Sequence, residues 1–364
     1  MIDDLGNPLP RNTLNEIRSK IHDGRTINHS VCDVIDNSID AEATKIDVWL
    51  DKQPEWQHDD EKKEFLMFVD NGKGIEKKDL KHIIEFNAER TGGYALHELG
   101  SFGLGLKDAL LAHGEEITVF SKLNGSEAAM VRLSMQLSRE REDWIYVNHE
   151  ELVVLVESWG TDKKRLEKWN TPVFNNAYQK IKTMDSGTII ILEFSHRPIE
   201  LEFDEDSEDE LERITVLSSL KEWIAMTFAD YLTGINIGNR TKDNPLEISV
   251  NGDPIYPLDP FMKSEIGKGD FDGQQGTLVA RWPFQYSGLE CVFNQYILPN
   301  KQERNSRCQG HDNRMKKATK HQIVNLQGIY IKRNGRILDG PWNGMWRREG
   351  LSLIHISEPT RQEA

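Results

Sequence analysis

Three oxygen-bearing side chains follow one another at helical spacing early in the chain. Asp33, Asn37 and Asp40 stand at positions i, i+4 and i+7, so a helix over residues 28–41 would place them on one face, opposite an apolar stripe. An amide oxygen is a ligand that suits Mg²⁺, and a carboxylate one turn away can orient or deprotonate a water. A solvated helix face shows the same pattern, so the triplet alone leaves both interpretations open.

A second candidate lies where an apolar segment ends in a glycine-rich turn. Asp70 closes the segment 65–69, and Gly72 and Gly74 follow it. Glycines permit a tight turn and a close approach of the backbone to a flat ligand. A carboxylate at this place can accept the exocyclic amine of a purine, although an ordinary turn between a strand and a helix would look alike.

A third candidate is the glycine-rich run from Gly100 to Lys107, which precedes a predicted helix. Free N–H groups at a helix start and the helix dipole favour phosphate, and Lys107 adds a positive charge. The run lacks the Gly-Lys-Ser/Thr ending of a Walker loop. Its glycines follow the order G-x-x-G-x-G, which is not the dinucleotide-binding fingerprint.

The elements around these candidates predict an α+β protein of two domains. Strands are expected over residues 46–50, 65–69, 117–121, 128–133, 144–147 and 188–194, with a helix over 104–113. The acidic run 204–210 predicts a solvated linker. Beyond it we expect an amphipathic helix ending at Gly234, hairpin turns at 251–252 and 334–335, and strands over 246–250, 277–281, 291–298 and 328–332.

Composition narrows the class of protein. The 364 residues carry a net charge of -15 and 37% hydrophobic residues, and no apolar run approaches the ~20 residues of a membrane span. The N-terminus lacks the pattern of a secretory signal, so we expect a cytoplasmic protein without membrane contact. Three distant cysteines predict neither disulfides nor a cysteine metal site.

The charge is distributed unevenly along the chain. Residues 301–348 contain twelve Lys or Arg against three Asp or Glu, a net +9, which leaves -24 on the remainder. The basic segment predicts a contact surface for phosphates of a nucleotide or of DNA, or else a solvated basic face.

Order and spacing together point to one ATP site. The chain resembles the GHKL ATPases, a superfamily that includes gyrase B subunits, ninety-kilodalton heat-shock chaperones, histidine kinases, MutL proteins and MORC proteins. The resemblance covers about residues 10 to 195 and rests on four stretches in the family's order: 33–41, 70–74, 100–107 and Gly187-Thr188. It implies a Bergerat-type α/β sandwich, with ATP and Mg²⁺ as cofactors.

Site roles follow from the resemblance at matching positions. It implies that Asn37 binds Mg²⁺, that Asp70 contacts adenine and that Thr188 completes the adenine site through water. It implies a general base at Asp33, where hydrolysing members usually have the longer Glu. The remaining nucleotide-binding positions are Asp40, Ala41, Gly72, Gly74, Ile75, Gly100, Ser101, Phe102, Gly103, Leu104, Gly105 and Lys107, and residues 89–99 resemble the ATP lid.

The second half resembles the transducer domain of the gyrase, MutL and MORC branch, with bacterial MORC-like proteins the closest. This implies an α+β, ribosomal S5-like domain over 214–350 after an ATP-binding domain over 1–203 and a linker over 204–213. A transducer lysine reaches the γ-phosphate in that branch, and Lys301 is the candidate. Residues 351–364 resemble a translated sequencing adaptor and are expected to be non-native.

The resulting expectation is a slow ATPase that acts as a nucleotide-gated homodimeric clamp, in DNA maintenance or phage defence, with DNA bound through 301–348. Two alternatives stay open. One is an ATP-sensing module that hardly hydrolyses ATP, suggested by Asp33 in place of Glu. The other is a chaperone-like protein that acts on polypeptides.

Overall fold

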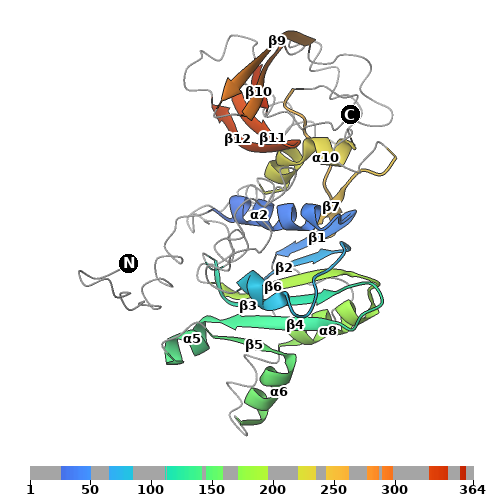
Figure 1. Cartoon of the computed structure of the whole chain (residues 1–364), viewed down its shortest axis with the longest axis vertical. Coiled ribbons are helices and arrows are strands. Elements are labelled where there is room, and N and C mark those ends of the chain that lie inside the picture. Colours follow the sequence, from blue (N-terminus) through green and yellow to red (C-terminus); the bar gives the residue numbers. More distant parts are fainter. Residues whose placement is uncertain are drawn as a thin grey trace, which may run out of the picture. The chain divides into compact units, whose positions relative to one another are not determined.

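The computed structural model of the chain describes residues 26–50, 65–84, 111, 113–141, 145–158, 171–195, 220–234, 243–261, 277–286, 289–297, 328–342 and 353–357 (Figure 1). The chain divides into two compact units. The first comprises residues 1–217 and 248–254, and the second comprises 218–247 and 255–364. No helix in the described ranges is long and apolar enough to cross a membrane.

The first unit is built on an eight-stranded sheet in the order β5-β4-β3-β6-β2-β1-β7-β8. Figure 1 shows the run from β1 through β2, β6 and β3 to β4. The central strands are almost wholly buried, as their apolar sequences predict. The bounds are β1 Lys45–Leu50, β2 Phe65–Asp70, β3 Gly114–Lys122, β4 Ala129–Ser134, β5 Tyr146–Asn148, β6 Gly187–Ser195, β7 Glu247–Val250 and β8 Asp253–Pro254.

Helix α2 (Ile27–Asp40) confirms the helix expected from its apolar spacing. It begins after Thr26, whose side chain accepts a hydrogen bond from the His29 N–H. Val31, Val34 and Ile35 are fully buried. Ser38 on the same helix donates to Asp70 of β2, which places α2 over the sheet face to which Asp70 points. The short helix α3 (Leu80–Ile84) follows the turn after β2.

The opposite face of the sheet is covered by α5 (Met135–Arg141), α6 (His149–Ser158) and α8 (Pro172–Thr183). Each helix contributes to one apolar cluster with side chains of β2, β3 and β6, among them Phe120, Phe174 and Ile189. Sequence reasoning missed these helices. For α8 a signal was present, because Thr171 accepts a hydrogen bond from the Phe174 N–H and Pro172 opens the helix.

The hairpin of β7 and β8 turns at Asn251 and Gly252, with φ of 52° and 83°, as the sequence predicts. Its place differs from the expectation that residues 246–250 belong to the second domain. The Asn251 N–H donates to the Val48 carbonyl at 2.8 Å, and the Asn251 side chain accepts from the Leu50 N–H at 2.8 Å. The hairpin therefore extends the first unit's sheet, and β1 is not its edge. The predicted linker 204–213 lies outside the described residues.

The second unit combines helix and sheet, in agreement with the predicted α+β class. Residues 220–227 are helical, and α10 (Ala229–Thr233) ends at Gly234, which adopts the left-handed conformation with φ 65° as predicted. The sheet has the order β12-β11-β13-β10-β9. The bounds are β9 Thr277–Tyr286, β10 Leu289–Ile297, β11 Ile329–Arg333, β12 Arg336–Trp342 and β13 Leu353–Ser357.

Strand β13 falls within the tail that sequence reasoning excluded from the fold. It pairs parallel with β11 and antiparallel with β10, so Ile356 lies opposite Ile331 on one side and Phe293 on the other. A segment with alternating β-branched residues has a high propensity to form a strand, whatever its origin. Residues 353–357 therefore pair within the second unit's sheet, and their non-native origin stays a prediction.

Candidate functional site

Asp70, Thr188 and Ser121 form a row across three neighbouring strands of the first unit. Asp70 is the last residue of β2 and lies opposite Thr188 of β6, which in turn lies opposite Ser121 of β3. Directly paired residues point to the same face of a sheet. All three side chains are buried, with exposed fractions of 4%, 5% and 0%. The row therefore presents polar atoms beneath α2 in an otherwise apolar layer.

The Asp70 carboxylate is held by uncharged donors. Its Oδ1 accepts the Gly72 N–H at 2.9 Å, and its Oδ2 accepts the Ser38 hydroxyl at 3.0 Å. Burial raises the pKa of Asp70 from 3.8 to about 6, and the hydrogen bonds from Gly72, Ser38 and Thr188 offset part of that rise. Asp70 is thus ionised at neutral pH, and each oxygen keeps acceptor capacity for a ligand.

Two glycines at this site are required by geometry. Gly74 has φ of 77°, and a Cβ there would lie 2.1 Å from the Lys122 carbonyl oxygen. Gly187 has φ of 141°, and a Cβ there would lie 2.2 Å from the Asp70 carbonyl oxygen. Both backbones pack directly against neighbouring strands, so a larger residue would displace the strand ends that carry Asp70 and Thr188.

Helix α2 brings the predicted magnesium ligand and base to the same region. The Asn37 Nδ2 donates to the Asp33 carbonyl at 3.0 Å, which directs its Oδ1 away from that carbonyl. Asn37 is exposed and Asp33 half-buried, whereas Asp36 is buried with 3% exposure. Ser38, the neighbour of Asn37, bonds to Asp70, so the helix is tied to the strand end. The ranking of Asp33 above Asp36 as the base stays a prediction, now with Asp33 the more accessible of the two.

The remaining predicted residues divide into two groups. Asp40 ends α2, the Ala41 carbonyl accepts the Lys73 N–H at 2.9 Å, and the Ile75 N–H donates to Ser121 at 2.9 Å, so these three lie around the turn 71–75. The others lie outside the described residues: Gly100, Ser101, Phe102, Gly103, Leu104, Gly105, Lys107, Lys301 and the lid 89–99.

Three residues with a structural part in the site were missed by sequence reasoning. Ser38 has a local signal, because it follows Asn37 within the motif. Asn71 accepts the N–H groups of Thr44 and Lys45 at 2.9 and 2.8 Å and so joins the turn to the start of β1. Ser121 is far from both in sequence, and only strand pairing brings it to Thr188.

No group of three or more His, Cys, Asp or Glu side chains suited to a metal ion occurs within the described ranges. The magnesium site expected at Asn37 is not of this kind and stays a prediction. Phosphate and water oxygens would have to complete the six ligands that Mg²⁺ prefers.

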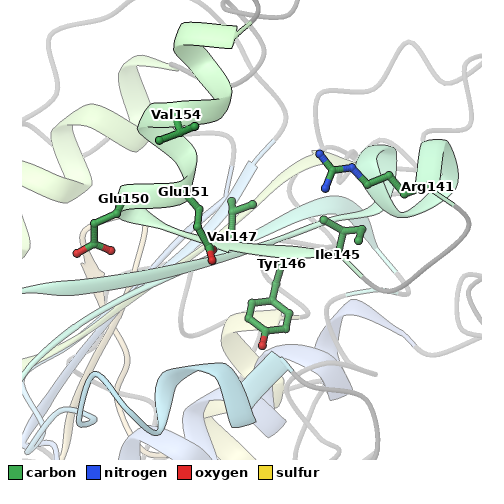
Figure 2. A pocket seen from close by; sticks show the side chains of 7 residues that line it. All are labelled: Arg141, Ile145, Tyr146, Val147, Glu150, Glu151 and Val154. Atoms are coloured by element: carbon green, nitrogen blue, oxygen red, sulfur yellow. The ribbon is translucent and has the colours of Figure 1, made fainter.

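A separate pocket of about 510 Å³ lies at the other end of the sheet. Figure 2 shows side chains of α5, α6 and the β5 region lining it. In the sheet, β4, β3 and β6 lie between β5 and β2. Glu150 pairs with Lys77 at 2.8 Å, and Glu151 and Asn148 cap the start of α6 reciprocally. The acidic groups of this pocket are therefore engaged in the fold, and the pocket is distinct from the Asp70 row. Its lining residues are Arg141, Ile145, Tyr146, Val147, Glu150, Glu151 and Val154.

Comparison with known proteins matches this region to one family. Residues 25–185 match the model of the histidine kinase-, DNA gyrase B- and HSP90-like ATPases. The chain is 27% identical over 135 residues to the mouse protein ATPase MORC2B, and 25% identical over 132 residues to human ATPase MORC2. These matches cover 37% and 36% of this chain but only 12% of each relative.

The matched residues include α2, the Asp70 turn, β3 and α8, and they end just before Gly187 and Thr188. The matched range contains the motifs at 33–41, 70–74 and 100–107 in the order expected from the sequence. Residues 25–185 therefore form a GHKL-type ATPase domain that is similar in sequence to the MORC ATPases.

Proposed function

We propose that the chain binds Mg-ATP at the Asp70 row and hydrolyses it slowly. The observation that carries the proposal is Asp70 itself, a buried carboxylate whose partners among the described residues are neutral donors. Burial without a cation costs stability, and such a cost is typical of a functional group. An exocyclic amine offers the donor that this carboxylate can still accept.

The chain's own residues would divide the work along the site. Asp70 and Thr188 would hold the adenine, and the buried strand ends would exclude water around it. The Asn37 Oδ1 would hold the metal, which would supply positive charge to offset the negative charge of the phosphates. The glycine run 100–107 with Lys107 would bind the phosphates through N–H groups, and Lys301 would stabilise charge that develops during transfer.

Asp33 would orient the attacking water and accept its proton. It stands one helical turn before Asn37 on α2 and is half-buried. Asp is about one methylene shorter than the Glu usual in the family, and a misplacement of ~1 Å can cost ~100-fold in rate. The same observation favours the second candidate function, an ATP-sensing module in which binding alone drives the conformational change.

For the whole protein we propose a cytoplasmic, nucleotide-gated homodimer that acts on DNA in maintenance or phage defence. The support is the sequence similarity to MORC ATPases and the net +9 of residues 301–348. The second unit would act as an S5-like transducer, for which its α+β composition is the support. A role on polypeptide clients is the alternative.

Steady-state hydrolysis of Mg-ATP by the full chain tests the enzymatic proposal. We expect slow turnover in the wild type and at least a ~100-fold loss in Asp33→Asn, with ATP binding retained. Glu42→Gln is the matched control, because it removes an exposed acid just past the same helix. Binding without turnover in the wild type would favour the ATP-sensing module, and absence of binding would refute the proposed site.

Two further measurements test the proposed clamp. Sedimentation with and without a non-hydrolysable ATP analogue should show a dimer that requires nucleotide. Duplex DNA should raise the hydrolysis rate if the substrate is DNA, whereas an unfolded polypeptide should raise it if the protein acts as a chaperone.

A further inference from the structure

Three aromatic side chains follow one another on an edge strand of the second unit's sheet. Strand β9 is the last strand in the order of that sheet and lies beside β10 (Figure 1). Trp282, Phe284 and Tyr286 stand at positions i, i+2 and i+4 of β9, so these three residues, the aromatic row, point to one face. Their exposed fractions are 51%, 40% and 68%. Contiguous exposed apolar side chains mark interaction sites, so the row points to a partner.

The face that carries the aromatic row is not the face on which the core of the second unit packs. On β10, Phe293 lies opposite Trp282, and the centroids of the two rings are 5.3 Å apart. Asn294 and Tyr296 of β10 point to the other face, where Asn294 is buried and Tyr296 packs against Phe261 of the core. The row therefore lies on the open face, and Phe293 supports Trp282 from the neighbouring strand.

The spacing of the three rings suits the bases of a single nucleic-acid strand. Side chains two positions apart on a β-strand are ~6.6–6.8 Å apart along the strand. This is about twice the ~3.4 Å between successive bases of one strand of a duplex. A base can therefore stack on each ring only where the nucleic acid is unstacked and extended. Stacking on aromatic side chains is a common way to bind single strands whatever their sequence.

Charge favours a polyanion over other partners of an apolar surface. Residues 298–328, which connect β10 to β11, contain seven Lys or Arg against two Asp or Glu, a net +5. This segment is attached to the sheet at both ends, so its positive charge is tethered to the sheet that carries the row. Pro283 removes one backbone donor from β9, and proline on an edge strand disfavours pairing with a strand of a second copy.

We propose that the aromatic row binds single-stranded nucleic acid by stacking with its bases, while the basic segment attracts its phosphates. This goes beyond the function proposed above, because it assigns base contacts to a described surface and requires neither ATP nor the Asp70 row. DNA and RNA share the chemistry that the row recognises.

The test measures binding of fluorescently labelled oligothymidylate and oligouridylate to the full chain without ATP, by fluorescence anisotropy. We expect Trp282→Ala to weaken binding about tenfold, because the platform for one base is lost. Trp282→Phe keeps a ring and should retain most of the affinity. The ratio of the two wild-type affinities shows whether DNA or RNA is preferred.

Two controls separate stacking from other effects. Tyr256→Ala removes a comparably exposed aromatic side chain outside the row and should leave the affinity within twofold of the wild type. A duplex of oligothymidylate with its complement should bind wild type and Trp282→Ala equally, because its bases are already stacked and paired. If circular dichroism shows that Trp282→Ala does not fold, Tyr286→Ala replaces it, since Tyr286 is the most exposed of the three rings.

Absence of single-strand binding by the wild type would overturn the proposal. So would an affinity within twofold of the wild type in the folded row variant, or an equal loss in Tyr256→Ala. Vesicles of phosphatidylserine and phosphatidylcholine test a membrane surface, and sedimentation tests a second copy. Loss of either association in the row variant, with oligonucleotide affinity unchanged, would reassign the surface. None of these outcomes affects ATP binding, so the two proposals fail separately.

Discussion

Buried carboxylates lie on both faces of the first unit's sheet, a pair on one face and Asp70 on the other. On the face covered by α8, Glu116 of β3 and Glu193 of β6 flank Arg132 of β4, at 3.4 and 3.5 Å. On the face covered by α2, no such cation contacts Asp70 among the described residues, and Asp70 bonds to Ser38 and Gly72. Strand β6 contributes a residue to each face. Thr188 and Glu193 are separated by an odd number of positions, so their side chains point to opposite faces of the sheet.

Asp70, Glu116 and Glu193 are all buried, so burial alone does not distinguish a functional carboxylate from a structural one. One oxygen of Glu116 also accepts from the Ser134 hydroxyl at 2.9 Å, and one oxygen of Glu193 accepts from the Thr171 hydroxyl at 2.6 Å. Arg132 lies over the Phe174 ring. That cluster connects three strands to the start of α8. Within the part of the chain that the structure describes, no cation neutralises Asp70, and burial raises its pKa. A ligand donor would reduce the cost of that burial, whereas Glu116 and Glu193 already face the Arg132 cation.

The largest expected effect on stability comes from removing the cation between Glu116 and Glu193. Arg132→Met would leave two carboxylates buried without a cation, and we expect a loss of about 3–5 kcal/mol in the free energy of unfolding. Urea denaturation of the full chain, followed by far-ultraviolet circular dichroism, measures it. Arg139→Met is the matched control, because Arg139 pairs with Glu115 at 2.8 Å near the surface, and we expect about 0–1 kcal/mol there. Equal losses in the two variants would contradict the contrast.

The next effect distinguishes function from stability at Asp70. Asp70→Asn removes the charge that the ligand amine would meet, and we expect ATP affinity to fall about 10- to 100-fold, as for loss of a hydrogen bond to a charged group. Stability at pH 7 should stay the same or rise, since the ionised group is buried at a cost. Calorimetric titration and urea denaturation measure the two quantities. A parallel loss of both would make Asp70 a structural residue like Glu116.

The pH dependence of stability follows from the same raised pKa. The pKa of Asp70 is about 6 in the folded chain against 3.8 ordinarily. Between these values the folded state holds the proton more tightly than the unfolded state, so stability falls as pH rises from about 4 to about 6. Above pH 6 the loss is complete, at about 3 kcal/mol for a shift of about two units.

Other groups titrate in this range, so the measurement is the stability of the wild type relative to Asp70→Asn at each pH. We expect the unfolding free energy of the wild type to fall relative to that of Asp70→Asn between about pH 4 and pH 6, and the difference to be constant above pH 6. A difference that is constant from pH 4 to pH 7 would show that Asp70 is not destabilised by burial.

The smallest effect concerns the neighbour of Ser121. The Lys122 ammonium group donates to the carbonyls of Lys182 and Met184 at 2.9 and 2.7 Å, at the C-terminal end of α8. We expect Lys122→Met to cost about 1 kcal/mol of unfolding free energy, with ATP affinity unchanged within twofold, because Lys122 points to the α8 face. A selective loss of ATP binding would show that the two faces are coupled. Thermal unfolding and calorimetry separate the outcomes.

Much of the fold could be predicted from patterns that act over a few residues. The helix spacing of Asp33 and Asn37, the apolar segment that ends at Asp70 and the helix end at Gly234 agree with the structure. Each depends on periodicity or on one residue's preferred backbone conformation. The helices α5, α6 and α8 were not predicted, and α6 has only a modest segregation of apolar residues to one face.

Register and strand order could not be predicted in this way. The sequence places residues 247–250 in a strand but does not say which sheet it joins, because a short alternating strand fits either edge. The same limit applies to residues 353–357, whose composition suggested an origin outside the protein and whose alternation nevertheless fits between β10 and β11.

The sequence by itself determined the chemistry that is available: the carboxylates, the amide and the glycines, in an order that identifies a GHKL-type ATPase domain. Tertiary structure decided which of these groups act together. It placed Ser121 beside Thr188 across 67 positions of sequence and left Asp70 with neutral donors, while Glu193 received an arginine. The reason is physical, since charge compensation and hydrogen-bond direction depend on distances between strands, which no local pattern encodes.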